Sequence, residues 1–326
     1  MLEEIDLNDP TTKALYDSYP EDRKDDFVDA YVYLKYIGVG IGTIKSILMP
    51  GVPLADRIEK FKKEANPEIL ESFEKYADKY KEALAGGAET SFYNAKVVDL
   101  DDAIKLVTVD VDVDLEVPTN VIPFKLAREI VLEGNPTIAI GQCGCRAAMP
   151  EAGVKCMPEP YEACMFIGDP AASFIADNGD KFRKIDSEEA VRLLEDFHTR
   201  GFTHEAYFKT DMNGFYAICN CCSCCCPSVG RTNMVLDGTM PFTNLAASGS
   251  VAVIEDDECI GCGACVELCK YHAIKLNEDE TCAEIILDRC MGCGVCENPC
   301  PTGAITMRAE PSKGGILDLD ELRKAT

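Results

Sequence analysis

The 19 cysteines of this 326-residue chain are gathered in two short segments, and this uneven placement constrains the fold more than any other feature. Residues 1–142 and 227–258 contain no cysteine, whereas residues 143–226 contain ten and residues 259–300 contain nine. In a cytoplasmic chain, closely spaced cysteines are typical of metal binding and not of a disulfide framework. We therefore expect two separate metal-binding modules.

The second segment repeats one cysteine spacing. The pattern Cys-x-x-Cys-x-x-Cys-x-x-x-Cys occurs at residues 259–269 and again at residues 290–300, where Pro301 follows. Three thiolates spaced in this way wrap around one corner of an iron–sulfur cube and each bind one of its irons, and the fourth points to the other cluster of the pair. The spacing predicts two [4Fe-4S] clusters. The expected ligands are Cys259, Cys262, Cys265 and Cys300 for the first, and Cys290, Cys293, Cys296 and Cys269 for the second.

This segment, about residues 250–310, resembles the bacterial-type ferredoxin domain that carries two [4Fe-4S] clusters. The resemblance implies a ferredoxin-like fold with an internal repeat and a role in electron transfer. Lys270 stands where members of that family usually have the proline that is seen here as Pro301. Cys282 fits neither repeat, and we expect it to be a small buried residue in a strand-like run.

The first cysteine segment has a different pattern. Six thiols crowd into residues 219–226, and four more precede them. Because neighbouring side chains of an extended segment point to opposite faces, adjacent cysteines cannot all reach one cube. We therefore expect one or two further iron–sulfur centres of unknown type, or one centre larger than a cube. The candidate ligands are Cys143, Cys145, Cys156, Cys164, Cys219, Cys221, Cys222, Cys224, Cys225 and Cys226.

The motifs of this middle segment resemble those of iron–sulfur proteins from anaerobic bacteria and archaea, in which such a module precedes a two-cluster ferredoxin domain. The shared features are the sequence around Cys143, the turn at residues 201–204 and the thiols of residues 219–226. The resemblance implies an architecture and a cofactor class but no reaction. Arg146 and His204 are candidate neighbours of the centre. A hydrogen bond to sulfur or a surface ion pair is favoured for Arg146, and a structural hydrogen bond is favoured for His204.

Apolar periodicity and turn residues predict an α+β multidomain protein. We expect a helical N-terminal region at 1–90, a central α/β cysteine-rich module at 91–245, and a ferredoxin-like 2[4Fe-4S] domain with a polar tail at 246–326. The elements expected in the central module are strands at 107–117, 137–140 and 214–218, and helices at 124–132 and 187–198, the second with an N-cap serine.

The charge balance limits the partners. With 57 acidic and 32 basic residues, the net charge is −25, which argues against nucleic acid because phosphate binding requires a basic surface. An acidic surface suits a redox partner protein with a basic docking patch. The apolar stretch at 31–49 is interrupted by charged residues and glycines, so no membrane span is expected. The acidic amino terminus lacks the order of a signal peptide, from which we expect a cytoplasmic protein.

These features support three hypotheses for function. The first is an electron-transfer protein of anaerobic metabolism that passes electrons between a partner and the centre of the middle module. The second is an iron–sulfur oxidoreductase whose active site is that centre and whose ferredoxin domain supplies electrons. The third is a zinc-binding scaffold. The sequence identifies neither the donor, the acceptor, nor a small-molecule substrate.

Overall fold

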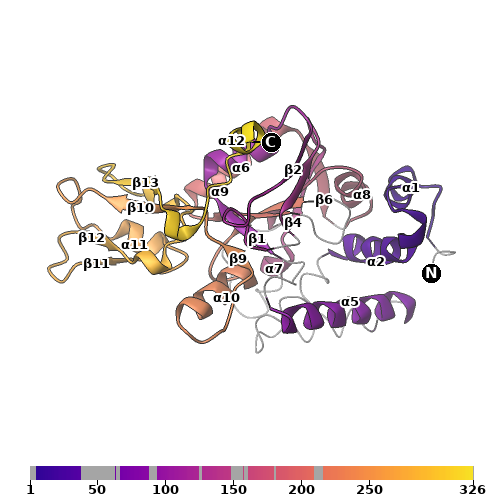
Figure 1. Cartoon of the computed structure of the whole chain (residues 1–326), viewed down its shortest axis with the longest axis horizontal. Coiled ribbons are helices and arrows are strands. Elements are labelled where there is room, and N and C mark those ends of the chain that lie inside the picture. Colours follow the sequence, from indigo (N-terminus) through magenta and orange to yellow (C-terminus); the bar gives the residue numbers. More distant parts are fainter. Residues whose placement is uncertain are drawn as a thin grey trace.

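The protein is a mixed helix and sheet structure, seen in a computed structural model. Figure 1 shows the C-terminal module, coloured orange to yellow, at one end of the long axis and helices α1 and α2 at the other. None of the helices in the described part of the chain is long and apolar enough to cross a membrane. The structure describes residues 5–37, 63, 67–87, 94–124, 127–147, 157, 161–179, 181–208 and 216–325.

Helices and strands alternate after an N-terminal region that is helical where it is described. The α-helices are α1 (Pro10–Asp17), α2 (Lys24–Lys35), α5 (Pro67–Ala85), α6 (Leu100–Val107), α7 (Gly144–Ala147), α8 (Ala171–Asn178), α9 (Ser187–Thr199), α10 (Pro227–Leu236), α11 (Ala264–Leu268) and α12 (Leu319–Ala325). The strands are β1 (Ala95–Val98), β2 (Val113–Glu116), β3 (Glu129–Leu132), β4 (Ile138–Gln142), β5 (Glu162–Ile167), β6 (Phe182–Ile185), β7 (Thr203–Tyr207), β8 (Tyr216–Cys221), β9 (Leu245–Ala246), β10 (Ser250–Ile254), β11 (Ile274–Leu276), β12 (Ala283–Ile285) and β13 (Ile305–Ala309).

A seven-stranded sheet forms the centre of the molecule, in the order β6-β4-β5-β8-β7-β1-β9. Neighbouring strands are antiparallel except β1 and β9, which are parallel. Strand β8 leads into the six-thiol segment and is paired on both sides. Its Cys219 lies opposite Cys164 of β5 on one side and Glu205 of β7 on the other. The sheet therefore brings residues from three strands together at this point.

The two faces of the sheet carry different side chains because residues alternate along a strand. Helices α6 and α9 cover one face. There the hydroxyl of Tyr216 donates to a backbone carbonyl of α6 at 3.0 Å, and His198 of α9 stacks on His204 of β7. Cys164 and Cys219 alternate with these positions and lie on the opposite face. The cysteines of the middle segment thus gather on the face away from α6 and α9.

The N-terminal helices are held by caps and by aromatic contacts. Asp9 accepts from the backbone N–H of Thr12 at 2.7 Å and so caps α1. Helix α2 buries Phe27 and Leu34, as its apolar stripe predicts, and the ring of Tyr31 lies 5.3 Å from that of Phe174 in α8. These contacts join the N-terminal region to the edge of the central sheet. The apolar stretch predicted over 31–49 lies outside the described residues from residue 38 onwards.

Two predicted elements before the first cysteine are wrong. The expected strand at 107–117 is reduced to β2, because Val107 ends helix α6 and residues 108–112 form a turn and loop in which Val109 O accepts from Asn135 N at 2.7 Å. The region 124–132, expected to be a helix, contains strand β3. This strand pairs with β2 in antiparallel orientation, with Val113 opposite Leu132 and Glu116 opposite Glu129. The β-branched residues of β3 favour a strand, and the pairing partner in β2 overrides the helical periodicity.

The strands and the helix that flank the cysteines follow the predictions more closely. Strand β4 covers the run predicted at 137–140, and α9 covers the helix predicted at 187–198. The cap of α9 is Asp186, whose carboxylate accepts from Glu189 N at 2.7 Å, and not Ser187 as expected. Strand β8 extends beyond the predicted residue 218 to Cys221 and so carries two of the six thiols.

The C-terminal module consists of two small antiparallel pairs, β10 with β13 and β11 with β12. The chain then returns to the central sheet, where Leu317 and Leu319 are buried and Gly315 N donates to Asn120 O at 2.7 Å. The connector before the module contains β9, which joins the sheet. Lys96 of β1 contacts both segments that connect the module to the sheet. Its Nζ donates to Ala247 O at 2.7 Å before the module and to Gly315 O at 2.9 Å after it.

Candidate iron–sulfur sites

The two cysteine repeats of the C-terminal module form loops with the same backbone conformation. Gly261 and Gly263 in the first loop have φ of 63° and 75°, and Gly292 and Gly294 in the second have φ of 70° and 74°. Glycine adopts this left-handed conformation without the strain that a Cβ would add. Backbone N–H groups reach the sulfurs that frame these loops: Ala283 N donates to Cys259 Sγ at 3.4 Å, and Ala273 N donates to Cys269 Sγ at 3.2 Å. Such donors stabilise a thiolate.

The four residues predicted to hold the second cluster interact electrostatically. Burial raises the pKa of Cys296, and the thiolates of Cys293, Cys290 and Cys269 raise it further. Burial also raises the pKa of Cys293 to about 12, with Cys269 and Cys290 acting in the same direction. Without a metal these two thiols therefore stay protonated. To bind as four thiolates, the four residues require positive charge among them, which an iron–sulfur cluster supplies when bound.

The residues predicted to hold the first cluster lie nearer the surface, and Cys262 is exposed. Burial raises the pKa of Cys265, and Cys259 and Cys262 raise it further. Hydrogen bonds from the backbone of Ala283 and Gly261 lower the pKa of Cys259, which the nearby Cys300 opposes. Backbone donors therefore favour the thiolate form at the exposed end of the module.

Cys282 is half-buried and not part of the apolar core, which contradicts the expectation for it. It precedes β12, and its Sγ lies 3.3 Å from Ala283 O and 3.6 Å from Asp256 Oδ1. The prediction failed because β12 begins at Ala283, so that Cys282 is the last residue of an exposed turn. It lies beside Cys259 but outside both repeats.

Residues 252–307 match the family model of the 4Fe-4S dicluster domain. This match covers all eight cysteines of the two repeats and confirms both the ferredoxin-type resemblance of the segment and [4Fe-4S] as its class of cofactor. No curated protein and no solved structure matches the chain. The resemblance noted for the middle segment therefore stays a prediction.

The middle cysteines surround a small cavity on the face of the sheet opposite α6 and α9. Eight of the ten candidate ligands line it, together with Arg146, Tyr207 and Asn220. Cys224 does not line the cavity, and Cys156 lies outside the described residues. The lining cysteines are Cys143, Cys145, Cys164, Cys219, Cys221, Cys222, Cys225 and Cys226. Thiols more than seventy positions apart in the sequence thus meet in one place.

Hydrogen bonds connect the thiols around this cavity into a chain. Cys143 shares hydrogen bonds with Cys145 and Cys164, and Cys219 shares them with Cys164 and Cys221. These bonds are the largest cause of a lowered pKa at Cys143 and Cys219, and Arg146 lowers both pKa values further. The alternate members of the chain can therefore be thiolates, which is the form that binds metal.

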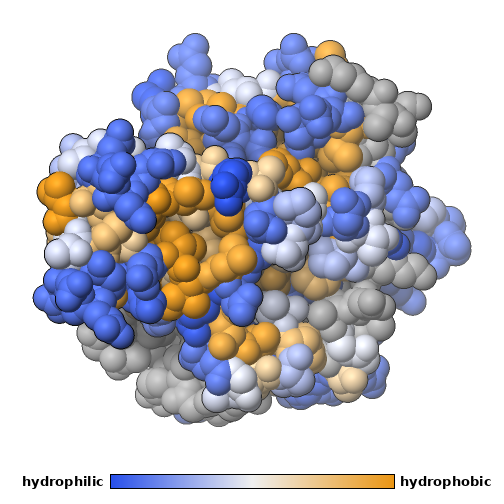
Figure 2. Space-filling view, turned by 60° about the vertical axis from the view of Figure 1, so that its left-hand side comes forward, coloured by the Kyte–Doolittle hydropathy of each residue, from blue (hydrophilic) through white to orange (hydrophobic). Residues whose placement is uncertain are grey.

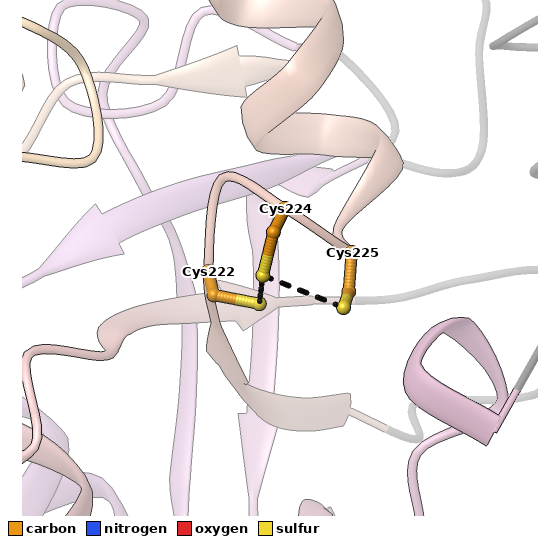
Figure 3. Close-up of side chains that lie close together, drawn as sticks. All are labelled: Cys222, Cys224 and Cys225. Carbon is orange, nitrogen blue, oxygen red and sulfur yellow. Dashed lines mark hydrogen bonds between the residues drawn. The ribbon is translucent and has the colours of Figure 1, made fainter. Parts of the chain in front are cut away.

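The six-thiol segment is not extended throughout, and this corrects the expected placement of its side chains. After β8 the chain turns at residues 223–225, where Cys226 N donates to Cys222 O at 3.1 Å. The sulfurs of Cys222, Cys224 and Cys225 converge at this turn (Figure 3), and Cys224 Sγ lies 3.2 Å from Cys222 Sγ and 3.6 Å from Cys225 Sγ. Neighbouring Cys224 and Cys225 were expected to diverge, but the turn brings them to the same side.

Arg146 is buried and lies beside the thiols. Its guanidinium donates to Asn220 O at 2.6 Å and stacks on the ring of Phe202 at 4.4 Å. The surface ion pair considered for this residue is therefore wrong, because the side chain is buried. Its charge lies close enough to Cys143 and Cys219 to favour their thiolates. The arrangement positions a fixed cation at one wall of the cavity.

His204 is fully buried and belongs to a structural hydrogen-bond network on the other face of the sheet. Asn220 Nδ2 donates to Ala163 O at 3.0 Å, which turns its Oδ1 towards His204 Nδ1 at 2.7 Å. His204 Nδ1 therefore carries the proton, and Nε2 accepts from His198 Nδ1 at 3.2 Å. Burial lowers the pKa of His204 to about 4, so the ring is neutral at pH 7. His204 does not line the cavity.

Glu205 is a site residue that the sequence patterns did not indicate. It is fully buried on β7, and its carboxylate lies with the thiols of Cys221 and Cys226, the donor atoms all within 4.8 Å of one another. Burial raises the pKa of Glu205 to about 8, and the charge of Cys219 adds to this effect. No local pattern indicated it, because its burial and its neighbours depend on the pairing of β7 with β8.

Proposed function

We propose that this protein transfers electrons between a partner that docks on the dicluster domain and a metal centre held by the middle cysteines. The observation that carries the proposal is the position of Tyr271. This buried residue of the C-terminal module lies close enough to Glu205, Cys293 and Cys221 for their charges to raise the pKa of its phenol after the larger effect of burial. One buried side chain thus lies near thiols of both modules, in the same apolar cluster.

The interface between the modules is apolar and continuous. A single cluster of buried side chains contains Cys221 and Cys226 of the middle segment together with Tyr271, Cys290 and Cys296 of the dicluster domain. A second contact lies at the turn after α9, where the side chain of Leu268 approaches Gly201 and Asn298 Nδ2 donates to His198 O at 3.0 Å. A well-packed interface suits rapid electron transfer because it holds the two sets of ligands at a fixed separation.

The surface beside the first ligand set supports docking of a basic partner. Residues 255–258 are four consecutive exposed acidic residues, and they directly precede Cys259. Ile260 is 63% exposed and offers an apolar contact within this acidic region. Figure 2 shows apolar residues gathered on this side of the molecule with hydrophilic residues around them. Acidic charge near an exposed ligand set increases the rate at which a basic partner meets it.

The residues of the dicluster domain fit the group that the family match implies. Two sets of four thiols, positive-φ glycines and backbone donors to sulfur are the features that hold [4Fe-4S] clusters. When bound, each cluster supplies a one-electron carrier. The protein's own contribution is to hold the first set nearer the surface, where Cys262 is exposed, and to bury Cys290 and Cys296 of the second set in the apolar cluster that also contains Tyr271.

Anaerobic redox titration of the full chain, followed by EPR together with iron and sulfide quantitation, tests this proposal. We expect more than the roughly eight iron atoms of two cubes, and signals of the second cluster that broaden when the middle centre is paramagnetic, because the two are close. A Cys290→Ser variant should lose this broadening and keep the middle signal. Iron and sulfide at the level of two cubes, or a middle centre that never accepts electrons, would refute the proposal.

An oxidoreductase is the second candidate, favoured by the cavity itself. Eight thiols line one space, and Glu205, Cys221 and Cys226 form a group of three donors, the number typical of metal sites that keep a position for substrate. Spectra of the reduced protein that change on addition of cyanide or small thiols would support this candidate, and unchanged spectra would oppose it. Zinc without sulfide at the middle cysteines would instead indicate the scaffold.

A further inference from the structure

We infer that Glu205 is an oxygen ligand of the middle metal centre, and that it binds a divalent first-row transition ion together with Cys221 and Cys226. This inference deepens the proposed function and rests on it where the ion is part of an iron–sulfur centre. The donors come from three places in the chain: β7 carries Glu205, β8 ends at Cys221, and Cys226 is the N-cap residue that directly precedes α10. Their donor atoms lie within 4.8 Å of one another.

The carboxylate of Glu205 lacks the compensation that a buried charge requires. The residue is fully buried, and among the described residues no lysine, arginine or histidine forms an ion pair with it. Its Oε1 has no hydrogen-bond partner in the described part of the chain. Ionising a buried carboxyl with no cation beside it costs several kcal/mol, which is why burial raises the pKa of Glu205 to about 8. A metal cation between the carboxylate and the two thiolates removes this cost.

Hydrogen bonds hold the other carboxylate oxygen in place. Tyr207 donates its hydroxyl proton to Glu205 Oε2 at 2.9 Å. The same hydroxyl lies 2.8 Å from Ser228 Oγ, which in turn accepts from Asn244 Nδ2 at 3.2 Å. Ser228 therefore donates to Tyr207, and the chain of bonds fixes the direction of the carboxylate. Fixing one oxygen while the other stays available is how proteins orient carboxylates that bind metals.

The donor set limits the metal. Two thiolates favour a borderline or soft ion, and one carboxylate is compatible with Fe²⁺ or Zn²⁺ but not with the all-oxygen preference of Ca²⁺ or Mg²⁺. The described residues supply three donors at this point, which leaves one position of a tetrahedral ion for a further ligand. That ligand is either a sulfide of a cluster, if the ion is one corner of it, or a small exogenous molecule. The two sources share the same metal-binding chemistry.

X-ray absorption and metal analysis of the anaerobically purified full chain test the inference. In the wild type we expect one oxygen scatterer at the iron or zinc edge in addition to sulfur. Glu205→Gln should lower the metal content by about one ion per chain, or remove the oxygen scatterer and increase the rate of metal loss to a chelator at least tenfold. Glu162→Gln is the matched control, because Glu162 lies on β5 of the same sheet but pairs with exposed Arg183. It should behave as wild type.

Two further variants separate ligation from a folding defect. Glu205→Asp keeps a carboxylate and should retain more metal than Glu205→Gln. Tyr207→Phe removes the hydrogen bond to Oε2 and should accelerate metal loss while the EPR signals of the dicluster domain persist. Wild-type metal content, absorption spectrum and chelator rates in Glu205→Gln overturn the inference.

The role of Glu205 and the proposed electron-transfer function can fail independently of each other. Suppose the chain contains zinc that Glu205→Gln loses, and no iron or sulfide beyond two cubes. This result refutes electron transfer to the middle centre but supports Glu205 as a metal ligand. Iron and sulfide beyond two cubes that stay unchanged in Glu205→Gln would support electron transfer to the middle centre and refute the role of Glu205 as a ligand.

Discussion

Cys164 and Cys219 lie directly opposite each other in the antiparallel pair of β5 and β8. Both are therefore fixed by the ladder of a central sheet and not by a flexible loop, and a hydrogen bond joins their thiols. Cross-strand neighbours in such a ladder have their Cβ atoms about 5 Å apart, close enough for two sulfurs to serve one metal centre. The sheet thus prepares part of the site before any metal binds.

Replacement of Cys164 by serine should remove the middle centre and leave the dicluster domain intact. Iron should fall to about eight atoms per chain, the content of two cubes, because one rigid ligand position is lost. Iron and sulfide quantitation with EPR measures this directly. Cys282→Ser is the control, since Cys282 lies outside both repeats and outside the cavity. Equal iron in wild type and Cys164→Ser would show that Cys164 is not needed.

Gly292→Ala should destabilise the second cluster loop more than a comparable change elsewhere. A Cβ at Gly292 would collide with the side-chain Oγ of Ser248 and with the backbone carbonyl of Ser250, the first residue of β10. Gly303 has the same φ of 70° but no atom within 4 Å of an added Cβ, so Gly303→Ala carries the conformational strain alone. We expect Gly292→Ala to cost roughly 1–3 kcal/mol more than Gly303→Ala because of the collision. Thermal unfolding midpoints, followed by loss of cluster absorbance, provide the comparison, and equal midpoints would contradict it.

Local spacing predicted the dicluster domain because all ligands of each loop are close in the sequence. The same is true of α9 and β4, whose periodicity was not opposed by their surroundings. The run at 107–117 is strand only in β2, because residues 108–112 form a turn and loop that bonds to Gly134 and Asn135, and the local alternation does not reveal these contacts. Glu205 could not be predicted, since its neighbours Cys221 and Cys226 are brought to it by strand pairing and by the start of α10. Contacts that depend on tertiary structure leave no local pattern.

Arg146→Lys should lower the stability of the protein and the retention of metal at the middle cavity. The guanidinium both donates to Asn220 O and stacks on Phe202, and an ammonium cannot make both contacts in the same geometry. We expect a loss of about 1–3 kcal/mol in stability and faster release of metal from the middle centre. Arg200 stacks on the same ring at 5.3 Å but lies at the surface with Asp196, so Arg200→Lys should change stability by less than about 0.5 kcal/mol. Equal effects of the two changes would argue against a special role for Arg146.

Lys96 should make stability depend on pH in the alkaline range. Burial lowers the pKa of Lys96 from 10.5 to about 8 in the folded chain, which the nearby Asp102 only partly opposes. Between pH 8 and 10.5 the unfolded chain therefore binds a proton that the folded chain does not, so the free energy of unfolding rises with pH in this window. The neutral amine keeps two N–H donors for its two acceptors, Ala247 O and Gly315 O, so no hydrogen bond is lost.

The test compares the wild type with Lys96→Met at pH 7.5 and pH 10. Titrations common to both proteins cancel, and the wild type should gain up to about 3 kcal/mol relative to the variant over this range. Lys105→Met is the matched control, because Lys105 is 40% exposed and its pKa is not lowered. It should show no gain of this sign. Parallel pH profiles of thermal unfolding for wild type and Lys96→Met would mean that Lys96 is charged in the folded protein throughout the range.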